Sequence, residues 1–214
     1  MGNNNKENGR KNMRLHGYDY SHAGLYFLTV VVQKRLHLFG EIRRDAPAWP
    51  FKMLLNDSGN MIEKWYHEIE HKFPDKRCRE MVVMPNHFHC IIENMALDDD
   101  QRPNDEQRPN DDQRPNDEQR PNDERRPEND NSKYGIHNKR YGATIGNVMD
   151  WFKTMTTNEY IRGVKFNNWR RFDGKLWQRN YYDHIIRNDN AYQKISEYII
   201  DNPIKWDDDT FNCE

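Results

Sequence analysis

The chain has 214 residues, which is enough for one globular domain with a modest appendage. Its hydrophobic fraction of 35% is low, but residues 98–130 contain no aliphatic or aromatic side chain and depress the average. That segment holds 13 acidic residues and 6 arginines, so the remainder has 27 basic and 22 acidic residues. The near-neutral chain therefore contains a mildly basic part, which permits a polyanionic partner.

Three cysteines, Cys78, Cys90 and Cys213, are widely separated and unlike a disulfide framework, which favours a reducing compartment. The N-terminus lacks the apolar core of a signal peptide, and no apolar run approaches the ~20 residues that cross a bilayer. We therefore expect a soluble, cytoplasmic protein without a membrane partner.

Structure is expected to begin after a disordered polar tail, residues 1–14. Residues 26–32 are β-branched and aromatic and predict a buried strand, and residues 50–55 are a weaker strand candidate. Residues 56–59 supply cap chemistry for a helix that continues to about His71. One buried face of that helix follows the i, i+3, i+4, i+7 spacing and comprises Ile62, Trp65, Tyr66 and Ile69.

Two strand-like runs follow, residues 79–84 and 87–93, with Pro85-Asn86 between them. Because proline interrupts a central ladder, we expect a kink or tight turn at this point. The next segment, residues 98–130, repeats the hexapeptide Gln-Arg-Pro-Asn-Asp-Glu/Asp from position 101 and should be a solvated, disordered insert.

After the insert, Thr144 can cap a helix that extends to about Ile161, and residues 176–186 predict another strand. Asp189 can cap a last helix, residues 190–201. Pro203 should end that helix, because a residue before proline, here Asn202, is disfavoured in helical geometry.

This order of elements predicts an α+β fold, a ferredoxin-like sandwich with a mainly antiparallel sheet and helices on one face. The single domain would comprise residues 15–97 and 131–210, interrupted by the low-complexity insert 98–130.

The chemical signal begins at His87-Phe88-His89. On a strand with a period of two, both imidazoles point to one face and Phe88 points to the other. The histidines could then share one divalent ion, although ordinary strand histidines have the same spacing. Cys90 points away from His89, so a closed structural zinc site is not predicted.

Longer blocks surround these histidines. They are residues 82–92 (Val-Val-Met-Pro-Asn-His-Phe-His-Cys-Ile-Ile), 176–188 (Leu-Trp-Gln-Arg-Asn-Tyr-Tyr-Asp-His-Ile-Ile-Arg-Asn) and 197–206 (Glu-Tyr-Ile-Ile-Asp-Asn-Pro-Ile-Lys-Trp). In these blocks the chain resembles the REP-associated tyrosine transposases, within the single-tyrosine HUH (His-hydrophobe-His) transposases. The resemblance covers nearly the whole chain outside the tail and the insert, and it implies the HUH endonuclease-like fold.

The resemblance implies a transposase that cleaves and rejoins single-stranded DNA through a covalent 5′-phosphotyrosine. It places the nucleophile at Tyr198, among four C-terminal tyrosines, and the metal at His87 and His89. The metal would be Mg²⁺ or Mn²⁺. Asn202 lies four residues after Tyr198, hence on the same helical face, and is the candidate third ligand.

Six further residues are weaker candidates for support of the site or for DNA contact, namely Lys153, Trp177, Gln178, Arg179, His184 and Arg187. His184 matches a recurrent family position. A tryptophan beside a cation suits single-strand binding, although Trp177 fits a core position equally well. Lysines and arginines near the second long helix could contact phosphates, or could be ordinary solvated charges.

The implied substrate is a hairpin from repetitive extragenic palindromes or an insertion-sequence end, which would place the protein at the nucleoid. Two alternatives remain, a DNA-hairpin-binding protein without cleavage and a replication-initiator-like HUH nickase. The family includes monomers and homodimers, so both states stay open. The net charge of −7 on residues 98–130 could also compete with DNA for the basic surface.

Overall fold

The computed structural model describes residues 20–43, 52–96 and 140–212. The predicted tail and insert, and the domain limits that depend on them, lie outside these residues. Among the described residues, no helix combines the length and the apolar character needed to cross a bilayer.

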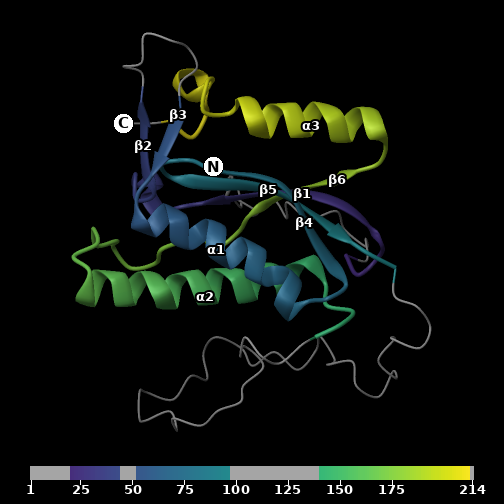
Figure 1. Ribbon diagram of the computed structural model, residues 1–214, viewed down its shortest axis with the longest axis horizontal. Coiled ribbons are helices and arrows are strands. Elements are labelled where there is room, and N and C mark those ends of the chain that lie inside the picture. Colours follow the sequence, from purple (N-terminus) through teal and green to yellow (C-terminus); the bar gives the residue numbers. More distant parts are fainter. Residues whose placement is uncertain (1–19, 44–51, 97–139, 213–214) are drawn as a thin grey trace, which may run out of the picture.

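A four-stranded antiparallel sheet forms the centre of the protein, in the spatial order β4-β5-β1-β6 (Figure 1). The strands are β1 (Gly24–Val31), β4 (Lys76–Val83), β5 (His87–Asn94) and β6 (Tyr182–Ile186). Two shorter strands, β2 (Gly40–Arg43) and β3 (Lys52–Leu55), form a separate hairpin. With α1 between β1 and β4 and α2 between β5 and β6, the chain follows the ferredoxin-like βαββαβ path.

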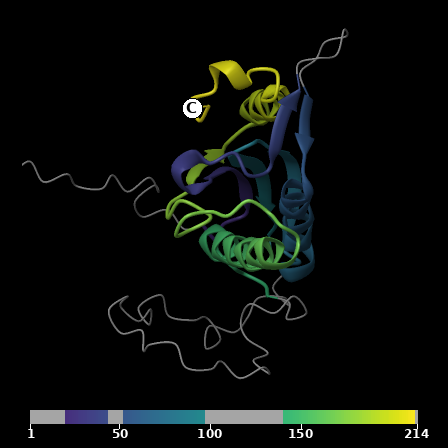
Figure 2. The ribbon, with the colours of Figure 1, turned by 90° about the vertical axis from the view of Figure 1, so that its left-hand side faces the viewer.

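Helices cover both faces of this sheet (Figures 1 and 2). Helices α1 (Asp57–Lys72) and α2 (Ile145–Phe166) pack on one face, against a core that includes Tyr26, Leu28 and Phe88. Helix α3 (Asp189–Asp201) lies on the opposite face and buries Ile199 against Ile91 and Ile186. The predicted α+β class and antiparallel sheet are confirmed, whereas the expectation that all helices share one face is wrong.

The reason for this difference lies in β5, where seven of eight residues are buried. A strand that points buried side chains to both sides needs a cover on each of them. The apolar stripe of α3 supplies the second cover, because Tyr192 and Ile195 pack with Ile199 against the sheet.

Helix starts follow the predicted cap chemistry closely. The Asn56 side chain accepts a hydrogen bond from the Gly59 amide at the start of α1. Thr144 and Asn147 form a reciprocal capping box at the start of α2, which continues beyond the predicted end to Phe166. At α3 the cap is Asn188 and not Asp189, since the Asn188 side chain accepts from the Ala191 amide.

Two predicted boundaries change in the C-terminal third. Only residues 182–186 of the predicted strand 176–186 join the sheet, while Trp177 makes a single bridge to Val32. Asn202 keeps helical angles (φ −56°, ψ −42°), so the expected departure from helical geometry before Pro203 is wrong. Hydrogen-bonded turns from Asp201 to Asp209, including a short 3-10 helix at Trp206–Asp208, follow α3 directly.

Candidate active site

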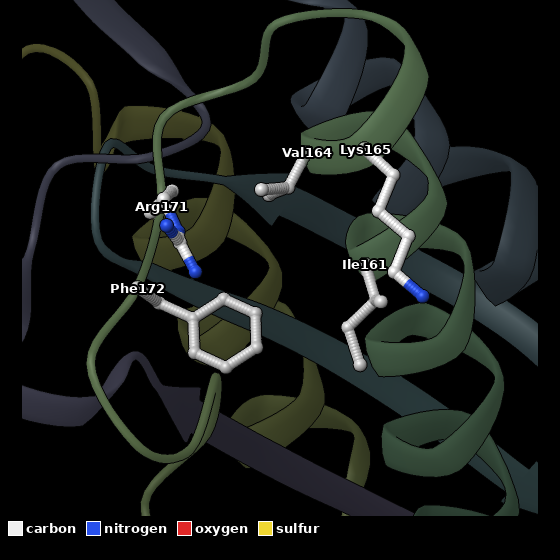
Figure 3. Close-up of a pocket in the computed structure, with 5 residues that line it drawn as sticks. All are labelled: Ile161, Val164, Lys165, Arg171 and Phe172. Carbon is white, nitrogen blue, oxygen red and sulfur yellow. The ribbon is translucent and has the colours of Figure 1, made fainter.

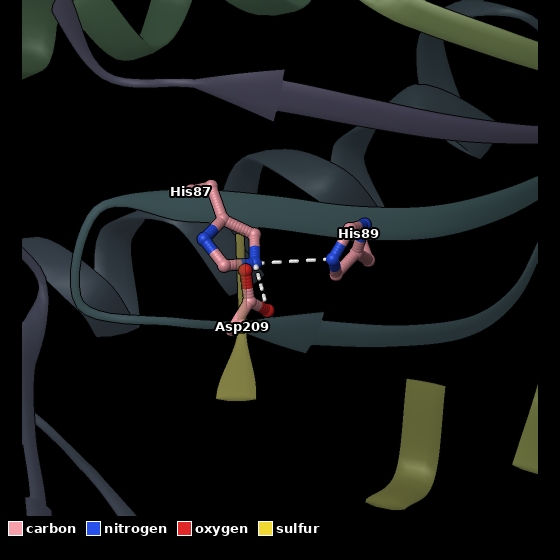
Figure 4. Close-up of side chains that lie close together, drawn as sticks. All are labelled: His87, His89 and Asp209. Atoms are coloured by element: carbon pink, nitrogen blue, oxygen red, sulfur yellow. Dashed lines mark hydrogen bonds and ion pairs between the residues drawn. The ribbon is translucent and has the colours of Figure 1, made fainter. Parts of the chain in front are cut away.

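His87 and His89 lie on β5 and point to the same face of the sheet (Figure 4), where His89 contacts Tyr198 of α3. Their Nε2 atoms are 3.0 Å apart, and the two residues are 0% and 2% exposed. Phe88 points to the other face and packs between Tyr66 and Phe152, with ring centroids 5.4 Å from each. The alternation predicted from the sequence therefore brings the two imidazoles together and anchors their strand in the core.

Hydrogen bonds on the far side of each ring orient the imidazoles. The Asn86 amide nitrogen donates to the carbonyls of Arg35 and Phe211, which turns Asn86 Oδ1 toward His87 Nδ1 at 2.8 Å. Because an amide oxygen can only accept, His87 Nδ1 carries the proton and His87 Nε2 presents a lone pair. His89 Nδ1 lies 2.7 Å from the Thr29 hydroxyl, which offers the same arrangement for His89.

Asn202 and Asp209 complete the cluster from α3 and from the segment that follows it. Asn202 is 1% exposed, and its Oδ1 is buried without a hydrogen-bond partner. Asp209 Oδ2 lies 3.8 Å from His87 Nε2, and one ligand atom from each of His87, His89 and Asp209 falls within 4.8 Å of the others. The Asn202 side chain contacts His87, and an unpartnered buried oxygen near two facing imidazole nitrogens fits a divalent cation well.

Tyr198 extends from α3 toward the same cluster. Its hydroxyl lies 3.4 Å from His89 Nε2, and its ring packs edge-on against Phe27. Burial, and then the charge of Asp209, raise the pKa of the Tyr198 phenol above its ordinary value. The side chain nevertheless remains 39% exposed, so a substrate can approach it while the phenol stays protonated.

The segment after α3 covers His87. The rings of Trp206 and Phe211 lie 5.9 and 4.8 Å from the His87 ring. Sequence reasoning missed Asp209, because it is one of three consecutive aspartates, 207–209, that the sequence cannot distinguish. It also missed Asn86 and Thr29, whose partners are identified only by the fold.

The six weaker candidates for support of the site or for DNA contact lie in the core, in a supporting loop contact or on the surface. Trp177 is 4% exposed and donates to the Thr156 hydroxyl, so it takes the core role that the sequence left open. Lys153 donates to the carbonyls of Gln178 and Arg179 and thereby holds their loop. His184 is exposed and pairs with Phe27 of β1, while Arg187 is exposed just beyond the end of β6.

The buried histidines make the stability of the metal-free protein depend on pH. Burial lowers the pKa of His89 to about 3, and burial followed by the charge of His89 lowers the pKa of His87. In the unfolded chain both rings titrate near their ordinary value of ~6.5. Below that pH the unfolded state binds more protons, so the free energy of unfolding falls as the pH drops toward 3.

We expect this loss to approach about 1.4 kcal/mol per pH unit for His89 alone. Urea unfolding in EDTA at pH 7, 6 and 5 measures it, with His89→Gln as the comparison. The wild-type protein should lose more stability over this range than His89→Gln, and equal slopes would contradict the assigned burial.

The Thr29 hydroxyl should tune the affinity of the cluster for metal. Thr29→Val keeps the β-branched shape that suits a strand but removes the partner of His89 Nδ1. We expect Mn²⁺ affinity, measured by calorimetry, to fall roughly 10- to 100-fold. Thr29→Ser retains a hydroxyl and should bind nearly as wild type does, whereas equal affinity in all three proteins would remove Thr29 from the site.

No protein-family model matches the chain. An uncharacterized protein of Haemophilus influenzae (strain ATCC 51907 / DSM 11121 / KW20 / Rd) is 32% identical over 203 residues, or 94% of this chain and 91% of the relative. Another protein of that strain, named "Putative REP-associated tyrosine transposase", is 21% identical over 187 residues, or 87% of this chain and 74% of that protein. A solved structure of a REP-associated tyrosine transposase bound to a REP hairpin gives a TM-score of 0.47 at 17% identity, covering 90% and 72% of the two chains.

The antiparallel α+β sheet, with its paired histidines and a nearby helical tyrosine, is a single-tyrosine transposase-like fold. The chain belongs to the same family as the 32% identical Haemophilus influenzae protein, and it is a distant homologue of the REP-associated tyrosine transposases. The family resemblance expected from the sequence blocks is thereby confirmed.

Proposed function

We propose that this protein cleaves and rejoins single-stranded DNA, with Tyr198 as the nucleophile and a divalent metal held by His87 and His89. One observation supports this most directly. The Tyr198 hydroxyl, the two imidazole nitrogens and the Asn202 side chain gather in one cluster, although they come from elements about a hundred residues apart. The distant homology to a tyrosine transposase agrees with this chemistry.

The donor set fits Mg²⁺ or Mn²⁺. His87 and His89 would supply nitrogen, Asn202 an amide oxygen and Asp209 a carboxylate oxygen. Such an ion, when bound, polarises the phosphodiester and neutralises charge that develops on its oxygens. Imidazole nitrogens favour Mn²⁺ over Mg²⁺, which prefers oxygen ligands.

The protein residues then have separate tasks. Tyr198 Oη attacks the phosphorus, the bond from phosphorus to the 3′ oxygen breaks, and the phosphate remains attached to the tyrosine as a 5′-phosphotyrosine. The phenol loses one proton and the departing 3′ oxygen gains one, so the step is balanced. Asn86 holds His87 in the tautomer that presents Nε2 to the site, and the Thr29 hydroxyl can accept the proton of His89 Nδ1, which would give His89 the same tautomer. Reversal by another 3′-hydroxyl rejoins the strand.

The substrate would be a DNA hairpin with a single-stranded flank, as the family resemblance implies. Tyr198 projects from a helix beside the sheet and is only partly exposed, which suits a flexible strand better than a rigid duplex. The protein would act at the nucleoid as a monomer or homodimer.

The decisive experiment incubates the full chain with a 3′-labelled DNA hairpin that carries single-stranded flanks and with Mn²⁺ or Mg²⁺, because a 5′-phosphotyrosine retains the fragment on the 3′ side of the cut. We expect a covalent protein–DNA adduct that survives denaturation and maps by mass spectrometry to Tyr198. Retained hairpin binding with no adduct in either metal would contradict the proposal and favour a binding protein without cleavage. If the adduct forms on duplex DNA that carries a replication-origin sequence but not on single-stranded DNA, a replication-initiator-like nickase is favoured.

A further inference from the structure

We infer that a small cavity at the end of α2 receives one unstacked base of the DNA strand that enters or leaves the active site. The inference rests on the proposed function and adds a binding site that the proposed function does not include. The cavity has a volume of about 220 Å³ and is lined by Ile161, Val164, Lys165, Arg171 and Phe172 (Figure 3).

The size and lining of the cavity suit a single flat ring. Its volume is below the roughly 300–1,000 Å³ of pockets for drug-sized molecules. Ile161 and Val164 provide an apolar wall on α2, and Phe172 faces them from the loop that follows (Figure 3). The Phe172 ring is held by an edge contact with Tyr160, at 5.5 Å between centroids, so it is a firm stacking surface.

The positive charge around the cavity favours a polyanion such as nucleic acid over a neutral partner. The stretch 161–175 contains one acidic residue, Asp173, which is paired with Lys34. Against it stand five exposed cations, Arg162, Lys165, Arg170, Arg171 and Lys175. Phe166, which is 81% exposed at the end of α2, adds a second aromatic ring beside them. Cations that follow a phosphate backbone, together with aromatic rings that accept bases, are the usual composition of single-strand sites.

The position of the cavity links it to the catalytic cluster. The turn at residues 33–37 contacts the cavity loop, because Gln33 N donates to the Leu176 carbonyl and Arg170 donates to the His37 carbonyl. The same turn contacts the segment over the histidines, where Arg35 donates to the Thr210 carbonyl and His37 packs on Trp206. The turn therefore connects the cavity loop on one face of the sheet with the segment over the histidines on the other face, and the inferred strand would follow this turn between the two sites.

Binding measured without metal tests the cavity independently of cleavage. The probes are a fluorescein-labelled twelve-nucleotide oligo(dT) and a strand of the same length made entirely of abasic residues, both titrated in EDTA with the full chain. Wild type should prefer oligo(dT). We expect Phe172→Leu to weaken oligo(dT) binding about tenfold and to leave abasic binding unchanged, since stacking is lost and phosphate contacts remain.

The double variant Lys165→Gln/Arg171→Gln should behave differently. It should weaken both probes and reduce the slope of log affinity against log salt by about 0.7 for each lost phosphate contact. Lys52→Gln, on the hairpin strand β3, removes an exposed positive charge elsewhere and serves as the control.

The inference is overturned if the double variant binds no more weakly than Lys52→Gln, or if a folded Phe172→Leu affects both probes equally. Should Phe172→Leu unfold, the wild-type comparison still decides, because equal affinity for oligo(dT) and the abasic strand would overturn the base site. If Phe172→Leu selectively weakens oligo(dT) binding and the double variant weakens both probes, but the protein forms no Tyr198 adduct, the base site is supported and the proposed cleavage is contradicted. If the Tyr198 adduct forms but neither variant changes binding in this way, the proposed cleavage is supported and the base site is contradicted.

Discussion

Tyr198→Phe should reduce covalent adduct formation on a single-stranded hairpin by at least about a thousandfold, as removal of an enzymatic nucleophile does. The substitution deletes only the hydroxyl that lies 3.4 Å from His89 Nε2. The ring contact with Phe27 remains, so the fold and the metal affinity should change little. Time courses of denaturation-resistant adduct with Mn²⁺ measure the effect, and calorimetry checks the metal site.

Tyr182→Phe is the matched control for this substitution. Tyr182 is 45% exposed on β6 and pairs with Thr29, so it lies on the same face of the sheet as the histidines. Its hydroxyl should be dispensable for adduct formation. If Tyr182→Phe abolishes the adduct and Tyr198→Phe does not, the nucleophile has been assigned to the wrong tyrosine.

His89→Ala should lower Mn²⁺ affinity at least about a hundredfold, which exceeds the typical cost of losing only a hydrogen-bond partner of a ligand. His89 contributes a buried nitrogen that lies between His87 Nε2 and the Tyr198 hydroxyl, so its loss opens the centre of the cluster. Adduct formation should fall below detection at micromolar Mn²⁺. Thermal unfolding with and without Mn²⁺ provides a second readout, since the stabilisation by bound metal should disappear.

His184→Ala separates a ligand role from a general effect of losing a histidine. His184 is exposed and pairs with Phe27, one position further along the sheet face than the Tyr182–Thr29 pair. We expect normal Mn²⁺ affinity in this variant. A loss as large as that in His89→Ala would make His184 a ligand and would exclude the cluster described above. Asn202→Ala and Asp209→Ala, measured in the same way, rank the two candidate oxygen ligands.

Local patterns were sufficient to predict most of the elements. Cap residues such as Asn56 and Thr144 mark helix starts because their side chains satisfy backbone amides within three residues. The period of two on β5 places His87 and His89 on one face, and the spacing of four on α3 places Tyr198 beside Asn202. These relations are contained within a single element, so they do not depend on how the elements pack.

Relations between elements were the part that could not be predicted. The place of α3 on the second face of the sheet follows from the burial of β5 on both sides, which its sequence does not distinguish from burial on one. The cap of α3 was misassigned by one residue, because Asn188 and Asp189 carry equivalent cap chemistry. Asn202 remained helical before proline because the turns that follow α3 hold it there.

The sequence by itself determined the histidine pair, the Tyr198–Asn202 spacing, the α+β class and the family resemblance, since each depends on residues close together or on blocks in order. Only the tertiary structure selected Asp209 from three adjacent aspartates, and only it joined Thr29 to His89 across sixty residues. The physical reason is that a metal site needs ligands within a few ångströms, and that distance is set by strand register and by turns that bring distant segments together. The histidine pair becomes a candidate metal centre only because the fold brings Asp209 and Thr29 next to it.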